Sequence, residues 1–172
     1  MGEESFIEMP QPLGLFAHEL HSRGKEFLTA FEKLSELGND DLNYPLYFLL
    51  AHSIELLLKS YLAAKGETKD KLSRQLRHNL KNIYNQCKLN LIPDVPDLCL
   101  LVACLHEMNK DNDFRYPSGY ILEVPKATEC LTVARSLAEV VAPAVQNAAI
   151  DATLRFASST RHHRGRKVRW SD

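Results

Sequence analysis

The sequence of 172 residues has little of what β-sheets and the common nucleotide-binding sites require. Val and Ile together number 14, whereas Leu and Ala together number 42. Because unbranched side chains lose little rotamer freedom in a helix and β-branched side chains lose more, this ratio favours helices. The chain also has no GxxxxGK[ST], GxGxxG or GxSxG motif, so a P-loop, a Rossmann site or a hydrolase nucleophile elbow has no support. We expect an all-α protein.

Cysteine is scarce too, and its spacing does not indicate a metal site. None of the four cysteines forms a CxxC motif, and Cys99 and Cys104 are five residues apart, which is poor spacing for joint ligation on a helix. All four are expected to be small core residues, kept reduced in the cytosol. His18 and His21 have a spacing at which two histidines can share a metal, but no third ligand lies nearby and HELH is not the zinc motif HExxH. We predict neither a metal nor a cofactor.

Long hydrophobic runs and a leader-like start are missing as well. No stretch reaches the ~18 apolar residues that a membrane-spanning helix needs. The acidic start MGEESFIEMPQPLG lacks the basic and apolar regions of a signal peptide. We therefore expect a cytoplasmic protein with no membrane partner.

The formal net charge of −1 hides an asymmetry along the chain. Residues 161–172 carry five basic residues and one Asp, a net charge of +4, so the preceding residues carry −5. We predict a single helical domain over residues 1–160 and a basic, mobile C-terminal tail over residues 161–172. His162, His163 and Trp170 interleave with the basic residues of the tail. An arm that contacts nucleic acid is therefore the alternative to a merely solvated end.

Apolar residues recur at helical spacing along five segments of the chain. A polar connector over residues 67–77 is expected to hold one helical turn. Residues 111–120 are predicted to be irregular and 121–124 extended, while Pro143 predicts a kink or a break in the last helix. The predicted helices, which form an up-and-down bundle of four long helices and one short one, cover residues 13–37, 45–66, 78–88, 97–110 and 125–156.

The second predicted helix is apolar almost all round, so we expect it at the centre of the bundle. It nevertheless carries His52, Glu55 and Lys59, whose spacing at ~100° per residue places them within about 60° of one another. Charges on a buried helix are costly unless they are paired. One interpretation is structural, with Glu55 paired to Lys59 within the helix and His52 bonded to a carbonyl. The other is a water-filled groove in which this stripe meets polar partners.

Three short motifs follow one another along the chain. Segment 44–66 contains an A-x3-E-x3-K pattern with Glu55 and Lys59 as its charged positions, the next helix starts with His78-Asn79-Leu80, and Phe114-Arg115-Tyr116-Pro117 comes later. With these motifs in this order the chain resembles HEPN domains, and most closely a bacterial branch of that superfamily. The resemblance covers about a third of the chain.

The resemblance implies a HEPN-like bundle of four or five helices, often dimeric, in a superfamily linked to RNA cleavage, nucleotide binding and toxin–antitoxin or defence systems. Its nuclease members carry Arg-x(4–6)-His, in which His exchanges the proton of a 2′-hydroxyl and Arg holds the phosphate. This sequence departs from that motif, because only three residues separate Arg74 from His78. Arg155 and His162 have six residues between them, but this pair runs into the basic tail.

A second pair is available if distant segments meet in space. His78 and Arg115 are the candidate catalytic residues if both converge on the stripe of Glu55 and Lys59. The same residues can instead form a structural network, in which His78 and Arg115 hold Glu55 and Tyr116 packs as an aromatic side chain. Two hypotheses follow, and whether the protein is an enzyme stays open. The first is an RNA- or nucleotide-associated HEPN-like bundle, and the second is a non-enzymatic module that forms a homodimer or docks on a protein partner.

Overall fold

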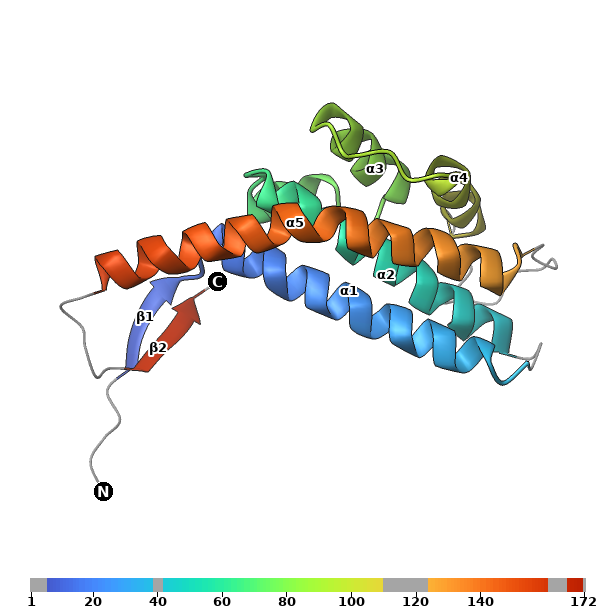
Figure 1. The fold of residues 1–172 in the computed structure, drawn as a ribbon, viewed down its shortest axis with the longest axis horizontal. Coiled ribbons are helices and arrows are strands. Elements are labelled where there is room, and N and C mark those ends of the chain that lie inside the picture. Colours follow the sequence, from blue (N-terminus) through green and yellow to red (C-terminus); the bar gives the residue numbers. More distant parts are fainter. Residues whose placement is uncertain (1–5, 39–41, 110–123, 161–166, 172) are drawn as a thin grey trace, which may run out of the picture.

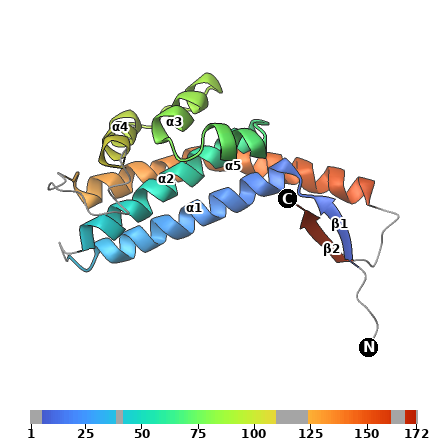
Figure 2. The ribbon, with the colours of Figure 1, turned by 180° about the vertical axis from the view of Figure 1, so that it is seen from behind.

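The chain folds into a predominantly helical structure with a small sheet at one end (Figure 1). This computed structural model describes residues 6–38, 42–109, 124–160 and 167–171. The elements are β1 (Phe6–Pro10), α1 (Leu13–Ser35), α2 (Asn43–Ala64), the π-helix η2 (Lys71–Gln75), α3 (Leu80–Leu89), α4 (Leu98–Asn109), α5 (Ala127–Ser159) and β2 (Lys167–Ser171). Helix α1 runs antiparallel to α2 and α5, and these three long helices pack on one another. Helix α3 packs on α2, and α4 packs on α3 and α5 (Figures 1 and 2).

The five predicted helices are all present, so the prediction of a helical protein is confirmed. They divide into three long and two shorter helices, however, rather than four long helices and one short one. The connector that was expected to hold one helical turn contains η2. The segments predicted to be irregular or extended, 111–120 and 121–124, lie outside the described residues except for Val124, which belongs to neither a helix nor a strand.

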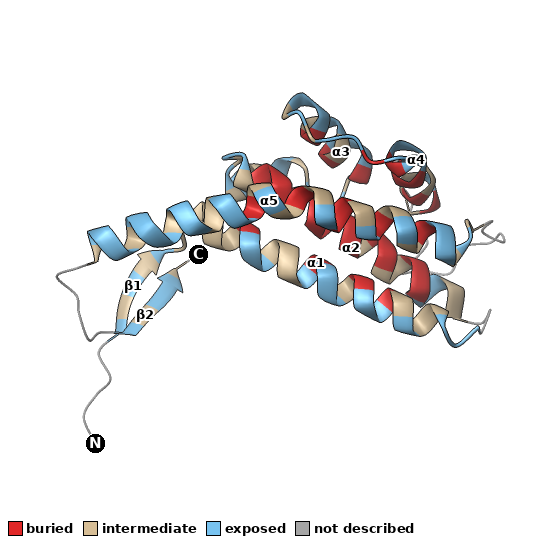
Figure 3. Ribbon diagram, in the orientation of Figure 1, coloured by how far each residue is buried: buried red, intermediate tan, exposed pale blue. Residues whose placement is uncertain are grey.

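Helix α2 is the centre of the core. Every residue from Ser53 to Ala63 is buried, which confirms the prediction of a central helix that is apolar on nearly all sides (Figure 3). By length and composition alone the helix could cross a membrane, but 83% of its apolar window is buried inside the protein. Packing against the surrounding helices therefore accounts for its apolar character.

Two glycines allow α1 to approach its neighbours closely. A Cβ on Gly24 would lie 2.9 Å from Leu57 Cγ, and Ser53 Oγ donates a 2.7 Å hydrogen bond to the Gly24 carbonyl. A Cβ on Gly14 would lie 2.0 Å from the carbonyl oxygen of Ala148 in α5. Any larger side chain at either position would push the helices apart, because the interior is close-packed.

Glu67 fastens the connector after α2 to α3. Its carboxylate accepts hydrogen bonds from Lys71 Nζ at 2.9 Å, Gln86 Nε2 at 2.7 Å and Asn90 Nδ2 at 3.4 Å. The bond from Lys71 is the largest of the effects that lower the pKa of Glu67. At the other end of the connector, the side chain of Asn79 caps the start of α3. The chain between α2 and α3 is therefore held at both ends.

Helix α5 is continuous from Ala127 to Ser159, although Pro143 lies inside it. The sequence predicted a kink or a break at this proline. The helix arches gently over the bundle in Figure 1, with Pro143 at its midpoint, and no break occurs. Both Pro143 and Glu139, whose carbonyl loses its intrahelical donor, are exposed, so water can satisfy the freed carbonyl.

Strands β1 and β2 form a parallel sheet that joins the two ends of the described chain. Glu8 lies opposite Arg169 in this sheet, and the Trp170 ring contacts Phe156 of α5 at a centroid distance of 5.2 Å. The sheet extends from the bundle beneath the end of α5 (Figures 1 and 2). The sequence predicted a mobile tail over residues 161–172, and the part of it that the structure describes, residues 167–171, forms strand β2. Such a short strand, paired with one at the other end of the chain, leaves no local pattern to detect.

Replacing Gly24 by Ala tests the close contact of α1 with α2. We expect Gly24→Ala to lower the free energy of unfolding by about 1–3 kcal/mol, because the added methyl group overpacks against Leu57. Helix propensity alone predicts the opposite sign, a gain of about 1 kcal/mol. Urea denaturation followed by circular dichroism measures the change. Ser22→Ala on the same helix is the control, with an expected change within about 0.5 kcal/mol, and a stabilised Gly24→Ala variant would contradict the close contact.

Candidate functional site

A buried pair of opposite charges lies in the middle of α2. Glu55 and Lys59 are only 6% and 8% exposed, and Lys59 Nζ lies 2.8 Å from Glu55 Oε1. The structure thus contains the intrahelical pair expected from the i, i+4 spacing, with Glu on the favoured N-terminal side. A buried ion pair is tolerable only when the remaining hydrogen-bonding groups of both partners are also satisfied. The partners that satisfy them come from the connector between α2 and α3.

His78, two residues before α3, forms hydrogen bonds with the Glu55 carboxylate in addition to the one from Lys59. Its Nδ1 lies 3.0 and 3.1 Å from the two carboxylate oxygens of Glu55. Because an ionised carboxylate only accepts, Nδ1 carries a proton, and in the neutral ring Nε2 keeps its lone pair. The His78 side chain is 65% exposed, and no hydrogen bond to its Nε2 is formed by the part of the chain that the structure describes. A buried carboxylate therefore orients an exposed imidazole.

The backbone carbonyl of Arg77 is the second hydrogen-bond acceptor of Lys59. Lys59 Nζ donates a 2.5 Å hydrogen bond to the Arg77 carbonyl. Arg77 has a φ of 47°, in the left-handed region that non-glycine residues rarely adopt. Such a conformation costs about 1–3 kcal/mol and persists only where its surroundings hold it. No sequence pattern singles out Arg77, because its part in the site depends on a backbone angle and not on its side chain.

Three exposed basic residues are close to His78 in the sequence. Arg74, Arg77 and Lys81 lie within four residues of His78 and are all exposed. Arg74 Nε lies 3.2 Å from Asp70 in an exposed ion pair, and such pairs contribute little in water. Arg77 Nε donates to the Arg74 carbonyl at 3.2 Å. We call the group His78, Arg74, Arg77 and Lys81 the His78 surface, and it combines an oriented imidazole with excess positive charge.

Among the described residues, the ring contacts of His52 are with aromatic side chains and not with Glu55 or Lys59. Its ring stacks on Phe48 at a centroid distance of 6.0 Å and an interplanar angle of 8°, and it meets Phe27 of α1 edge-on at 4.5 Å. The predicted polar stripe is therefore split into two parts. The angular spread of the stripe is enough to turn His52 toward α1, whereas Glu55 and Lys59 face the connector.

Arg115 and Tyr116 lie outside the described residues. The structure therefore places neither the candidate catalytic pair of His78 with Arg115 nor a network that includes Tyr116. Of the other arginine–histidine pair, Arg155 lies near the end of α5, and His162 lies outside the described residues.

Three of the four cysteines are poorly suited to act as nucleophiles. Cys87 and Cys130 are buried and Cys104 is half-buried, whereas Cys99 is exposed, so the prediction of a core residue is wrong for Cys99, which lies on the outward side of α4. Burial raises the pKa of the Cys130 thiol to about 11 and also raises the pKa values of Cys87 and Cys104. A thiol with a raised pKa carries little thiolate at neutral pH and is a poor nucleophile.

The two histidines of α1 have different surroundings. His21 Nε2 lies 3.0 Å from the carbonyl oxygen of Ala138 in α5 and donates to it, whereas His18 is exposed. Burial is the main cause that lowers the pKa of His21, and the hydrogen bond opposes it. Over the described ranges of the chain, no group of three His, Cys, Asp or Glu residues is placed to hold a metal ion.

Glu55→Leu tests whether the buried charges depend on each other. We expect this substitution to lower the free energy of unfolding by about 3–5 kcal/mol, because Lys59 loses its buried counter-charge. The double variant Glu55→Leu/Lys59→Met should recover most of that loss, since apolar residues of similar size often replace a buried ion pair at little cost. Chemical denaturation of the wild type and the variants Glu55→Leu and Glu55→Leu/Lys59→Met measures both effects. An equal loss in the single and double variants would show that the orphaned Lys59 charge is not the cause.

The lowered pKa of His21 predicts a loss of stability in weak acid. The unfolded chain takes up a proton on this residue near its ordinary value of 6.5, before the folded protein does. The stability is therefore retained above pH 6.5 and is lost as the pH falls from there through the lowered pKa of the folded state. His21→Gln keeps an N–H donor for Ala138 without titrating, so its unfolding temperature should fall less with decreasing pH than that of the wild type. His18→Gln removes only the smallest of the four contributions to this pKa and should change the slope far less than His21→Gln does, and equal slopes for the wild type and His21→Gln would contradict the assignment.

No protein-family model, curated protein or solved structure matches the chain. The resemblance to HEPN domains therefore stays a prediction from three sequence motifs. What the site can do follows from its own atoms: the buried Glu55 carboxylate holds the exposed His78 ring through Nδ1, Nε2 has no partner among the described residues, and three exposed basic residues lie within four residues of His78 in the sequence.

Proposed function

We propose that the protein is a cytoplasmic, HEPN-like helical bundle that binds RNA or nucleotides at the His78 surface. The observation that supports this proposal is the pairing of His78 Nδ1 with the buried Glu55 carboxylate, which leaves Nε2 toward solvent. His78 is also the first residue of the His78-Asn79-Leu80 motif, the second of the three motifs in which the chain resembles HEPN domains. A toxin–antitoxin or defence role and a homodimeric state belong to the same proposal.

The chemistry of the His78 surface suits a phosphate with a neighbouring hydroxyl group. His78 Nε2 can accept the proton of a 2′-hydroxyl, and the negative charge of Glu55 stabilises the imidazolium that results. The exposed Arg74, Arg77 and Lys81 offer donors to phosphate oxygens. Such a site needs no metal for proton transfer, and His78 is the residue that would carry it.

A second candidate is a non-enzymatic interaction module, and the same network supports it. Lys59 and Glu55 bind the Arg77 carbonyl and His78, so the network also fixes the connector to α2 without any ligand. The departure from the spacing of the nuclease motif favours this alternative. In this case the polar network is structural, and the partner is a second copy or another protein.

Variants of His78 distinguish the two candidates. We expect the purified protein to bind fluorescently labelled single-stranded RNA with an affinity that falls as salt rises, and His78→Ala to weaken binding or, if RNA is cleaved, to slow cleavage by about 10²–10⁴-fold. His18→Ala, an exposed histidine on α1, is the matched control and should change neither. Fluorescence anisotropy at two salt concentrations and gel analysis with and without EDTA measure both properties.

Each outcome of these assays decides between the candidates. Cleavage that resists EDTA and is lost in His78→Ala supports an RNase, and binding without cleavage supports an RNA-binding protein. Absence of both cleavage and salt-sensitive binding overturns the proposal and leaves the interaction module. Arg115→Ala then tests the motif-based pair independently, because an effect equal to that of His78→Ala would connect the two residues.

A further inference from the structure

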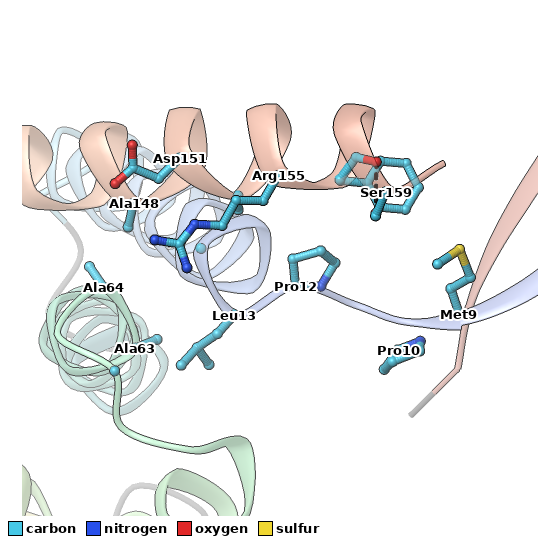
Figure 4. A pocket seen from close by; sticks show the side chains of 14 residues that line it. Met9, Pro10, Pro12, Leu13, Ala63, Ala64, Ala148, Asp151, Arg155 and Ser159 are labelled. Atoms are coloured by element: carbon cyan, nitrogen blue, oxygen red, sulfur yellow. Dashed lines mark hydrogen bonds between the residues drawn. The ribbon is translucent and has the colours of Figure 1, made fainter. Parts of the chain in front are cut away.

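A separate hollow lies where the two-stranded sheet joins the bundle. It has a volume of about 550 Å³ and includes none of the residues of the His78 surface. Its walls come from β1 and the start of α1, the end of α2, and the last third of α5 (Figure 4). Small-molecule sites of proteins have volumes of about 300–1,000 Å³, so this hollow has the size of a ligand site.

Most of the wall is apolar, and small residues alternate in it with larger apolar side chains. Leu13, Ala64, Ala152 and Phe156 are among the residues that line it. The close approach of Gly14 in α1 to α5 fixes the distance between two of the walls. The hollow is therefore a feature of helix packing and does not depend on a loop that would have to close.

Among the described residues that line this hollow, Arg155 is the only cation. In Figure 4 its side chain extends from α5 with the guanidinium toward Leu13 and Ala64. Over the described parts of the chain no hydrogen bond or ion pair to Arg155 occurs. Asp151, one helical turn earlier, also lines the hollow, and its carboxylate extends to the same side of α5 without forming an ion pair with the guanidinium. Within the described residues the exposed Arg155 therefore has no anionic partner, and it lies beside a mostly apolar wall.

We propose that this hollow binds a small amphipathic anion. Its carboxylate or phosphate group pairs with the Arg155 guanidinium, which matches either group with two parallel N–H donors. Its apolar body lies against Leu13, Ala64, Ala152 and Phe156, where it removes apolar surface from water. This site is independent of the function proposed for the His78 surface.

Binding in this hollow can be followed by the intrinsic fluorescence of Trp170. Trp170 is the only tryptophan of the sequence, and its ring lies 5.2 Å from that of Phe156, which lines the hollow. A ligand that packs on Phe156 should therefore change the emission of Trp170. The full chain is titrated with decanoate, decyl phosphate and the uncharged 1-decanol, each below the concentration at which it aggregates.

We expect a saturable change of Trp170 emission with decanoate, decyl phosphate or both, and weaker binding of decanol. Arg155→Ala should weaken binding of the anions by roughly tenfold or more and leave decanol binding unchanged. Ala64→Leu, which fills part of the hollow, should weaken binding of all three probes. Arg135→Ala, on the same helix but outside the hollow, is the matched control and should bind like the wild type. The better of the two anions identifies the head group.

Three results would overturn the proposal. One is the absence of a saturable signal with both anions, confirmed by calorimetry. Another is equal binding of decanol and the anions by the wild type. The third is an Arg155→Ala variant that binds both anions with unchanged affinity while its unfolding temperature falls. In that case Arg155 only stabilises the C-terminal end of α2, whose partial negative charge attracts cations.

Discussion

The burial of α2 on every side is the constraint on which the rest of the structure depends. A helix of 22 residues with an apolar surface almost all round cannot be covered by a single neighbour. Helices α1 and α5 cover two of its sides, and α3 packs on a third with α4 beside it. The arrangement of the other helices around α2 therefore follows from the need to keep the apolar surface of α2 away from water.

The two charges within that segment connect the core to the surface. Lys59 needs an acceptor and finds the Arg77 carbonyl, while Glu55 needs a donor and finds His78. Only a chain that turns sharply at Arg77 can present both groups, which explains its left-handed backbone. The Glu55 carboxylate of α2 therefore determines which ring nitrogen of the exposed His78 carries the proton, although His78 lies outside that helix.

The predictable parts of this protein are those that local periodicity encodes. Helix positions and the pair of Glu55 with Lys59 follow from spacings within a few turns, and the structure contains both. The split of the polar stripe at His52 depends on aromatic rings of two helices. The backbone conformation of Arg77 and the position of Arg155 beside an apolar hollow depend on contacts between segments that are separated in the sequence. Such features arise from packing and leave no periodic signal.

The parallel sheet has a consequence for the order of folding. Phe6 pairs with Lys167, so the sheet closes a loop that contains all five α-helices, and loops of that length close slowly and at high entropic cost. During synthesis β2 is made after every described helix, so the sheet cannot form until the residues of the whole bundle are present. A chain interrupted after α5 still contains all the helices that pack around α2, but its strand β1 has no partner strand.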